Sequence, residues 1–276
     1  MTARRRMARH HGGRPDFLTV APVSAKPRAT RLTHVLDTGV APADLRIFLD
    51  RCAPHVDIWK MGWGTAYLDP DVAEKLLILD QHGVRGCTGG TLLEAAWLQG
   101  RAEECLAWCA AIGFPCVEVS NGVAGMPLPE KRRLISAAAR HFTVVAETGS
   151  KDPAAPFSPE AWVQEMRGDI ESGAAWVVTE GRAQGTVGMF SSEGRVREEK
   201  AGRLVGLLAG QVGIPRVVFE APRKDQQAWL ISRLGADVSL GNVPPADVLA
   251  LESLRRGLRA DTIHLLTGAA PTVAAR

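Results

Sequence analysis

Short apolar runs alternate along this chain with longer stretches in which apolar residues recur at helical spacing. Eight of the runs end on an acid, an amide, a lysine or a glycine cluster, and helix-like stretches follow the first seven. Strands separated by helices of about 10–15 residues indicate βαβ units and a parallel sheet. Eight such units in about 250 residues match the size of a (β/α)₈ barrel. The pattern therefore predicts an α/β protein with a single-domain (β/α)₈ TIM barrel at residues 31–265.

The expected strands are short and nearly evenly spaced. They lie at residues 33–37, 56–61, just before 88, 115–119, 141–146, 174–179, 216–219 and 237–240. Helices are clearest at residues 43–52, 70–82, 129–140 and 158–172, and in the closing stretch around Glu252. A further helix is expected to begin near Leu92, capped by Thr91, with Glu94 three residues later completing a capping box.

Acidic residues gather where these runs end. In a (β/α)₈ barrel the carboxyl ends of the strands meet at one rim, which holds the active site. The acids at or near these ends are Asp37, Glu118, Glu147, Glu180 and Glu220. Any one of them can be a salt-bridged rim residue, but crowded carboxylates raise one another's pKa unless a cation is present. Hard oxygen ligands suit Mg²⁺, so we expect a subset of the five to bind Mg²⁺.

Basic side chains come from the same class of positions. They are Lys60, Lys151, Arg182 and Lys224. A lysine there can form a Schiff base, the aldolase-like role for Lys60, or it can transfer a proton, clamp a carboxylate or phosphate, or form a structural ion pair. The residues alone leave these roles open. Lys151 lies in a long loop with two prolines, residues 149–156, which is typical of a lid or a binding loop.

Glycine-rich turns at strand ends can present backbone N–H groups to anions. One such turn contains Gly89, Gly90 and Thr91, and another spans residues 185–188. The candidate substrate-binding residues are Gly89, Gly90, Thr91, Ser120, Asn121, Lys224 and Asn242. Trp63 lies in a glycine-flanked loop at a strand end, where it can form a pocket wall.

The composition limits the remaining function classes. With 46% hydrophobic and 23% charged residues the chain is an ordinary globular protein. The net charge of +3 owes much to residues 1–30, which we expect to be a basic, disordered and dispensable arm; residues 266–276 are expected to be a flexible tail. The rest has no basic, aromatic-laced patch, so no nucleic-acid partner is expected.

Cysteine usage and hydropathy indicate the compartment. The five cysteines form no CxxC pair and no Cys/His metal spacing, a pattern typical of reduced thiols in the cytoplasm. No apolar run approaches 18 residues, so neither a membrane span nor a secretory signal is expected. Assembly into a homo-oligomer is left open.

Several long motifs resemble one family, the phosphosulfolactate synthases, and in particular its bacterial branch. They include DIWKMGWGT at residues 57–65 and LESLRRGLRADT at residues 251–262. The other similar stretches are residues 89–94, 118–122, 147–152, 180–182, 219–227 and 241–243. The similarity is colinear and covers residues 32–262.

This resemblance implies a (β/α)₈ barrel and a carbon–sulfur lyase activity. The family adds sulfite to phosphoenolpyruvate in the presence of Mg²⁺ and yields phosphosulfolactate. The catalytic residues implied here are Lys151, as the proton donor, with Lys60 and Arg182. This chemistry also suits the residues, because an enediolate-like intermediate needs Mg²⁺ and cations to stabilise it and an acid to protonate C2.

The chain departs from the family pattern at three positions. Thr38 stands where members often have lysine, Asn121 where some have aspartate, and Ser150 where some have lysine. Two alternatives therefore stay open beside the aldolase: a different nucleophile added to phosphoenolpyruvate or a related enol phosphate, and a non-catalytic, stress-related barrel. The second would be expected to lose the acids and Lys151.

Overall fold

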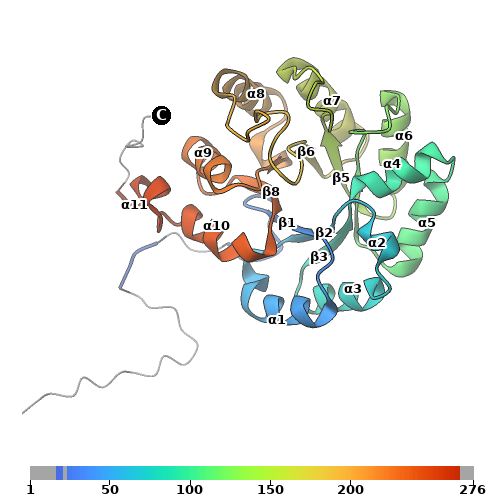
Figure 1. The fold of residues 1–276 in the computed structure, drawn as a ribbon, viewed down its shortest axis with the longest axis horizontal. Coiled ribbons are helices and arrows are strands. Elements are labelled where there is room, and N and C mark those ends of the chain that lie inside the picture. Colours follow the sequence, from blue (N-terminus) through green and yellow to red (C-terminus); the bar gives the residue numbers. More distant parts are fainter. Residues whose placement is uncertain (1–16, 21–23, 268–276) are drawn as a thin grey trace, which may run out of the picture.

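The computed structural model describes residues 17–20 and 24–267. Eight parallel strands pair in sequence order, and the last pairs with the first, so the sheet closes into a barrel (Figure 1). The strands are β1 Thr33–Asp37, β2 Ile58–Met61, β3 Arg85–Thr88, β4 Cys116–Val119, β5 Thr143–Thr148, β6 Trp176–Thr179, β7 Val217–Glu220 and β8 Ser239–Val243. The predicted (β/α)₈ barrel is confirmed.

Helices surround the barrel as an outer ring (Figure 1). The longer ones are α1 Pro42–Cys52, α3 Val72–Gln81, α4 Gly90–Leu98, α5 Ala102–Ile112, α6 Leu128–Ala138, α7 Pro159–Glu171, α8 Glu198–Gln211, α9 Lys224–Leu234 and α10 Val248–Arg255. Shorter elements are α2 Thr65–Leu68, α11 His264–Thr267, and the 3₁₀ turns η1 Ala53–His55, η2 Ile214–Arg216, η3 Pro245–Asp247 and η4 Ala260–Thr262. No helix among the described residues is long and apolar enough to cross a membrane.

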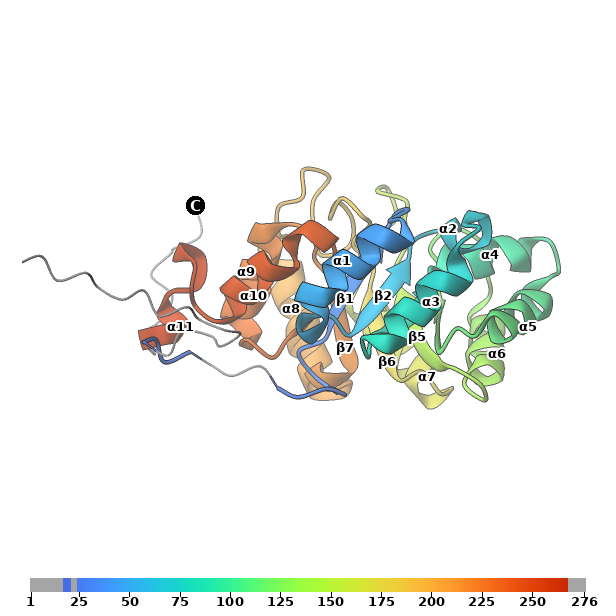
Figure 2. The ribbon, with the colours of Figure 1, turned by 90° about the horizontal axis from the view of Figure 1, so that it is seen from below.

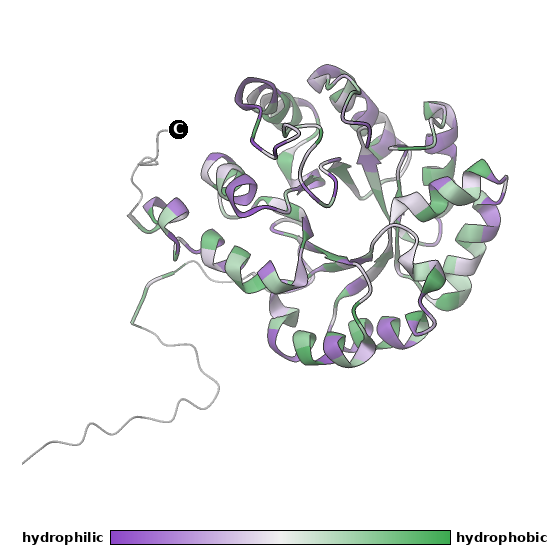
Figure 3. Cartoon of the chain, viewed as in Figure 1, coloured by the Kyte–Doolittle hydropathy of each residue, from purple (hydrophilic) through white to green (hydrophobic). Residues whose placement is uncertain are grey.

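The outer helices are amphipathic, and hydrophilic and hydrophobic residues alternate along them (Figure 3). In α6 the buried positions are Lys131, Leu134, Ile135 and Ala138, which follow the spacing of one helical face. This face packs towards the strands, so the large apolar core lies between the barrel and the helix ring.

A second, smaller apolar cluster links the strands to the site. It contains Leu32, Ile58, Cys87, Cys116, Val145, Val178 and Val218. Side chains alternate between the two faces of a strand, so the residue two positions later shares the same face. The pairs so related are Ile58 with Lys60, Cys116 with Glu118, Val145 with Glu147, Val178 with Glu180, and Val218 with Glu220. The apolar cluster thus supports a layer of charged residues nearer the carboxyl ends of the strands.

Several sequence-based expectations about local structure were wrong, and the strands expected from residues 56, 141 and 174 each begin two residues later. The helix α4 begins at Gly90 with Gly89 as its N-cap, so Thr91 does not cap it and no capping box forms there. Glu94 instead binds the loop after β4. The last strand begins at Ser239 rather than at 237, because the ladder with the neighbouring β7 begins with the pairing of Ser239 with Val218.

The expected domain boundary at residue 30 also needs correction. Arg28 is buried, and its guanidinium lies 2.9 Å from the Asp57 carboxylate, so this part of the arm packs on the barrel. Residues 24–30 run along the end of the barrel opposite the long loops (Figure 2). Residues 266 and 267, expected in the tail, belong to α11. The arm before residue 17 and the tail beyond residue 267 lie outside the described residues.

Candidate active site

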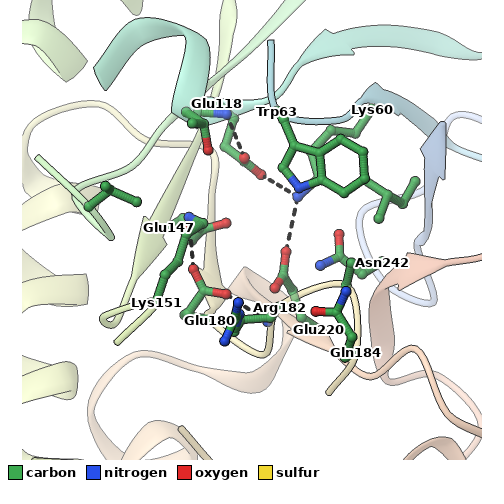
Figure 4. A pocket seen from close by; sticks show the side chains of 15 residues that line it. Lys60, Trp63, Glu118, Glu147, Lys151, Glu180, Arg182, Gln184, Glu220 and Asn242 are labelled. Atoms are coloured by element: carbon green, nitrogen blue, oxygen red, sulfur yellow. Dashed lines mark hydrogen bonds and ion pairs between the residues drawn. The ribbon is translucent and has the colours of Figure 1, made fainter. Parts of the chain in front are cut away.

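A pocket of about 310 Å³ lies at the carboxyl ends of the strands (Figure 4). Its lining residues are Leu36, Lys60, Trp63, Gly90, Thr91, Glu118, Val123, Glu147, Lys151, Glu180, Arg182, Ala183, Gln184, Glu220 and Asn242. They come from all eight strand ends and the loops that follow, because closure of the barrel brings these ends together. The long loops after β5 and β6 rise on the same side of the molecule (Figure 2).

Lys60 lies between two buried glutamates at the floor of this pocket. Its Nζ atom is 3.0 Å from Glu118 Oε2 and 3.0 Å from Glu220 Oε1. The second oxygen of each glutamate accepts a backbone N–H bond, from Gly90 at 2.8 Å and from Gly181 at 2.9 Å. Each carboxylate is therefore held on one side by an ammonium group and on the other by the turn after the neighbouring strand.

Lys151 makes a second bridge of the same kind. Its Nζ atom lies 2.6 Å from Glu147 Oε1 and 2.9 Å from Glu180 Oε2. The Arg182 backbone N–H donates to Glu180 Oε1 at 2.7 Å. The Lys151 side chain is 23% exposed and that of Lys60 is 5% exposed, so Lys151 is the lysine that faces the pocket opening.

The crowded charges shift the pKa values of the acids in opposite directions. Burial, together with the charges of Glu147 and Glu220, raises the pKa of Glu118 to about 7, although Lys60 opposes the shift. Burial also disfavours the ionised form of Glu147, but Lys151 and Lys60 outweigh it and lower its pKa to about 2. Burial and the neighbouring Glu147 and Glu220 raise the pKa of Glu180 well above its usual range.

Both lysines remain ammonium groups at neutral pH. Burial favours the neutral amine of Lys60, but Glu118, Glu220 and Glu147 together raise its pKa above the ordinary lysine value. Burial acts on Lys151 in the same direction, and Glu147 and Glu180 outweigh it, so the pKa of Lys151 is raised too. Each lysine therefore carries a proton and a positive charge into the pocket.

Carboxyl groups outnumber ammonium groups at the floor. Four carboxyl groups face two ammonium groups there, and one oxygen each of Glu118, Glu147 and Glu220 lie within 4.8 Å of one another. These three residues are the part of the site that can hold a hard divalent cation.

The backbone is strained where side chains enter the pocket. Trp63, Arg182 and Asn242 have φ angles of 54°, 61° and 54°, a region that non-glycine residues rarely adopt. They are three of the four such residues within the described part of the chain, and all three line the pocket. Strained residues of this kind cluster at functional sites. The Asn242 Oδ1 atom is buried and accepts no hydrogen bond from any described residue, so it is an acceptor available to a ligand.

The structure does not bring Asp37 to this site. The carboxylate of Asp37 is fully buried, pairs with Lys75 at 2.5 Å and accepts a bond from Trp59 Nε1 at 2.8 Å. Strand alternation explains the difference, since Leu36 faces the pocket and Asp37, one residue later, faces the helix layer. Asp37 is therefore a structural anion, and the expected subset of metal ligands excludes it.

Four expected substrate-binding residues also lie outside the lining set. Lys224, at the start of α9, pairs with Asp261 at 2.8 Å. The Ser120 hydroxyl donates to Glu94, and the Asn121 side chain exchanges bonds with the Met126 backbone. Gly89 is the N-cap of α4. The structure does place the other three candidates, Gly90, Thr91 and Asn242, in the pocket wall.

Some lining residues carried no sequence signal. Leu36, Val123, Ala183 and Gln184 line the pocket, and Trp63 forms part of its wall as expected. Gln184 follows Arg182 by two residues in a glycine-rich loop, so its position after a strand end was the available clue.

His34 lies within the barrel, fully buried, and neither ring nitrogen has a hydrogen-bond partner among the described residues. Burial lowers its pKa, and Lys60 adds to the shift, so this histidine is neutral.

Fold and pocket together define the class: a (β/α)₈-barrel protein with a charged pocket at the carboxyl ends of its strands, where barrels of this type carry their active sites. The family model of (2R)-phospho-3-sulfolactate synthase (ComA) matches residues 21–261. The chain belongs to this family, as its motifs indicated.

Relatives in the family are similar over nearly their whole length. The phosphosulfolactate synthase of Methanothermobacter thermautotrophicus is 39% identical, over 90% of this chain and 96% of its own. The enzyme of the same name from Bacillus subtilis is 38% identical, over 91% of this chain and 99% of its own. Among solved structures, 3-hexulose-6-phosphate synthase from Salmonella typhimurium superposes with a TM-score of 0.53, covering 81% of this chain and 98% of its own. At 15% identity, that likeness shows the barrel fold alone.

Proposed function

We propose that this protein is a phosphosulfolactate synthase that adds sulfite to C3 of phosphoenolpyruvate. The observation that carries the proposal is the pair of lysines, each held between two buried glutamates, in a pocket of a chain 39% identical to a protein of that name. Sulfur donates an electron pair to C3, and the C2–C3 double-bond electrons move into the carboxylate. One proton then adds at C2, and the phosphate ester is retained.

The residues of the pocket floor fit a magnesium ion. Glu118, Glu147 and Glu220 offer hard oxygen ligands within 4.8 Å of one another, and the four carboxyl groups outnumber the two lysines beside them. Burial and the acidic neighbours raise the pKa of Glu118 to about 7, so a further cation beside Glu118 would stabilise its ionised form. A bound Mg²⁺ would supply electrostatic stabilisation of the negative charge that develops on the substrate carboxylate.

Lys151 is the proton donor in this proposal. It is protonated at neutral pH, because Glu147 and Glu180 raise its pKa against the effect of burial. It is also the more exposed lysine and lies in the loop after β5, where it can reach the face of a substrate held on the floor. A fixed ammonium group beside a developing carbanion is a suitable general acid.

Lys60 and Arg182 are assigned electrostatic roles. The two carboxylates that contact Lys60, together with Glu147, keep its pKa above the ordinary lysine value in spite of burial. Schiff-base formation needs a neutral amine, so these contacts disfavour the aldolase alternative. Arg182 contributes a cation to the pocket wall, and we assign it to the phosphate or carboxylate of the substrate.

A direct assay tests this function. The purified protein, incubated with phosphoenolpyruvate, sulfite and Mg²⁺, should yield phosphosulfolactate by mass spectrometry, and the product should be absent when sulfite is omitted. Formation of a different adduct when sulfite is replaced by another nucleophile, with none from sulfite, would favour the alternative substrate. No turnover of any enol phosphate would favour a non-catalytic barrel, although the acids and Lys151 are retained.

The proposal extends to the cellular compartment and to the class of ligand. All five cysteines are free thiols, which suits the cytoplasm. We expect small-molecule substrates as its ligands, and the oligomeric state is to be measured by sedimentation.

A further inference from the structure

Glu94 is a buried acid whose partners are all hydrogen-bond donors of one loop. It lies on α4, is 2% exposed, and accepts backbone N–H bonds from Gly122 at 3.1 Å, Val123 at 2.8 Å and Ala124 at 2.7 Å. The Ser120 hydroxyl also donates to it. Four donors converge on one carboxylate, so the loop that follows β4 is tied to the start of α4.

The same loop holds Lys151 in two ways. The Lys151 backbone N–H donates to the Gly122 carbonyl at 3.0 Å. The Lys151 side chain also lies against Gly122, where an added Cβ would be 2.8 Å from Nζ and 3.3 Å from Glu180 Oε2. The position of this loop therefore sets both the backbone and the ammonium group of Lys151.

We infer that Glu94 is a positioning residue for Lys151, acting through residues 120–124. This inference rests on the proposed function, in which Lys151 delivers the proton. Glu94 itself is outside the pocket lining and touches no reacting atom. Its carboxylate matters because only an anion with two acceptor oxygens can satisfy three N–H groups and a hydroxyl together.

The Glu94→Gln substitution removes the negative charge and one of the two acceptor oxygens with almost no change in side-chain volume. The amide keeps one acceptor oxygen and places an NH₂ group against N–H donors, so the loop loses part of its anchor. A displacement of about 1 Å in a catalytic group can cost about 100-fold in rate. We expect kcat to fall roughly 10- to 100-fold, while KM for phosphoenolpyruvate changes less than about 3-fold, since the floor is untouched.

Hydrogen–deuterium exchange tests the link without any substrate. In Glu94→Gln, the amides of Gly122, Val123, Ala124 and Lys151 should exchange faster than in the wild type, and amides of β7 should not. Unchanged exchange at Lys151 would overturn the inference. This result is independent of the assay for phosphosulfolactate. A failure of the proposed function is therefore distinguishable from a failure of the positioning role of Glu94.

Two further variants separate positioning from general stability. Glu252→Gln removes a buried acid that pairs with Arg31 and Arg256; it should lower the melting temperature but leave kcat within about 2-fold. Gly122→Ala inserts a Cβ beside the Lys151 ammonium and should lower kcat while Glu94 keeps its partners. This variant still tests the inference if Glu94→Gln does not fold. Equal losses of kcat in Glu94→Gln and Glu252→Gln, or normal kcat in Gly122→Ala, would contradict the assignment.

Discussion

A lysine between two carboxylates occurs in two regions of this molecule, with different consequences. In the layer between barrel and helices, Lys75 pairs with Asp37 and Asp69, and Lys131 with Glu165 and Asp169. Inside the barrel, Lys60 pairs with Glu118 and Glu220, and Lys151 with Glu147 and Glu180. The contacts are alike, but the interior lysines and their glutamates line the pocket at the strand ends, and the helix-layer pairs lie outside that lining.

The difference is clearest between Asp37 in the helix layer and Glu118 in the interior. Asp37 accepts bonds from Trp59 and from the N–H groups of Gly39 and Val40 besides its ion pair, so it stabilises one arrangement of β1 and its turn. The interior acids face one another, and burial together with its acidic neighbours raises the pKa of Glu118 to about 7. A buried ion pair alone therefore indicates structure, whereas an excess of like charge beside a cavity and strained turns indicates chemistry.

The largest expected effect concerns the interior pair. Lys151→Met keeps most of the volume and removes the proton, so kcat should fall about 10²- to 10⁴-fold, as for loss of a general acid. Affinity for phosphoenolpyruvate should change much less. Steady-state kinetics measure both, and in deuterated water the wild type, but not the variant, should exchange the C2 proton of phosphosulfolactate.

A variant with near-normal turnover at saturating substrate and poor affinity would make Lys151 a phosphate clamp. The proton donor would then be sought at Lys60, the other lysine of the pocket.

The matched change in the helix layer should act on stability instead. Lys75→Met leaves Asp37 and Asp69 without their cation, and breaking a buried pair costs about 3–5 kcal/mol of unfolding free energy. Turnover per folded molecule should stay within about 2-fold, because Lys75 is outside the pocket. Urea denaturation and kinetics at low temperature measure the two quantities. A loss of turnover as large as that of Lys151→Met would remove the distinction between the regions.

The pH dependence of stability should reveal the crowding of carboxyl groups in the interior. The pKa of Glu118 is about 7 in the folded protein and near the ordinary glutamate value of 4.5 in the unfolded chain, so between these two pH values the folded state binds more protons. Without metal, the stability due to Glu118 should be fully present below pH ~4.5 and lost as the pH rises through ~7.

Magnesium should oppose that loss, since it favours the ionised carboxylate, and its affinity should fall as the pH drops below ~7. Melting temperatures across this range, with Mg²⁺ and with a chelator, measure both trends. Glu118→Gln should flatten the slope. A slope that persists in this variant, or activity that survives complete chelation, would contradict the account of the site.

The smallest effect is expected at Lys224, a residue whose sequence position suggested substrate binding. It pairs with Asp261, and its side chain is 47% exposed. Lys224→Ala should change kcat/KM less than about 3-fold, and stability by less than about 1 kcal/mol, as is usual for exposed ion pairs. A larger loss in kcat/KM would show that the pocket extends to the start of α9 during turnover.

Much of the architecture was determined by the sequence alone. The alternation of apolar runs and helical stretches predicted the barrel, because strand and helix periods are local properties of the chain. The acids and lysines at strand ends predicted where the pocket lies, and Glu118, Glu147, Glu180, Glu220 and Lys60 do line it. The alternation of side chains within a strand also indicated that Leu36 and Asp37 would not both face the pocket, since neighbouring residues of β1 face opposite sides.

Only the tertiary structure decided which charges meet. Lys60 and Glu220 are 160 residues apart, and their 3.0 Å contact exists because the barrel closes. Glu94 was expected to cap its own helix, yet the loop after β4 offers it four donors, which a local cap does not. Capping is a local preference worth about 1 kcal/mol, whereas a buried carboxylate must find all its partners wherever the fold places them.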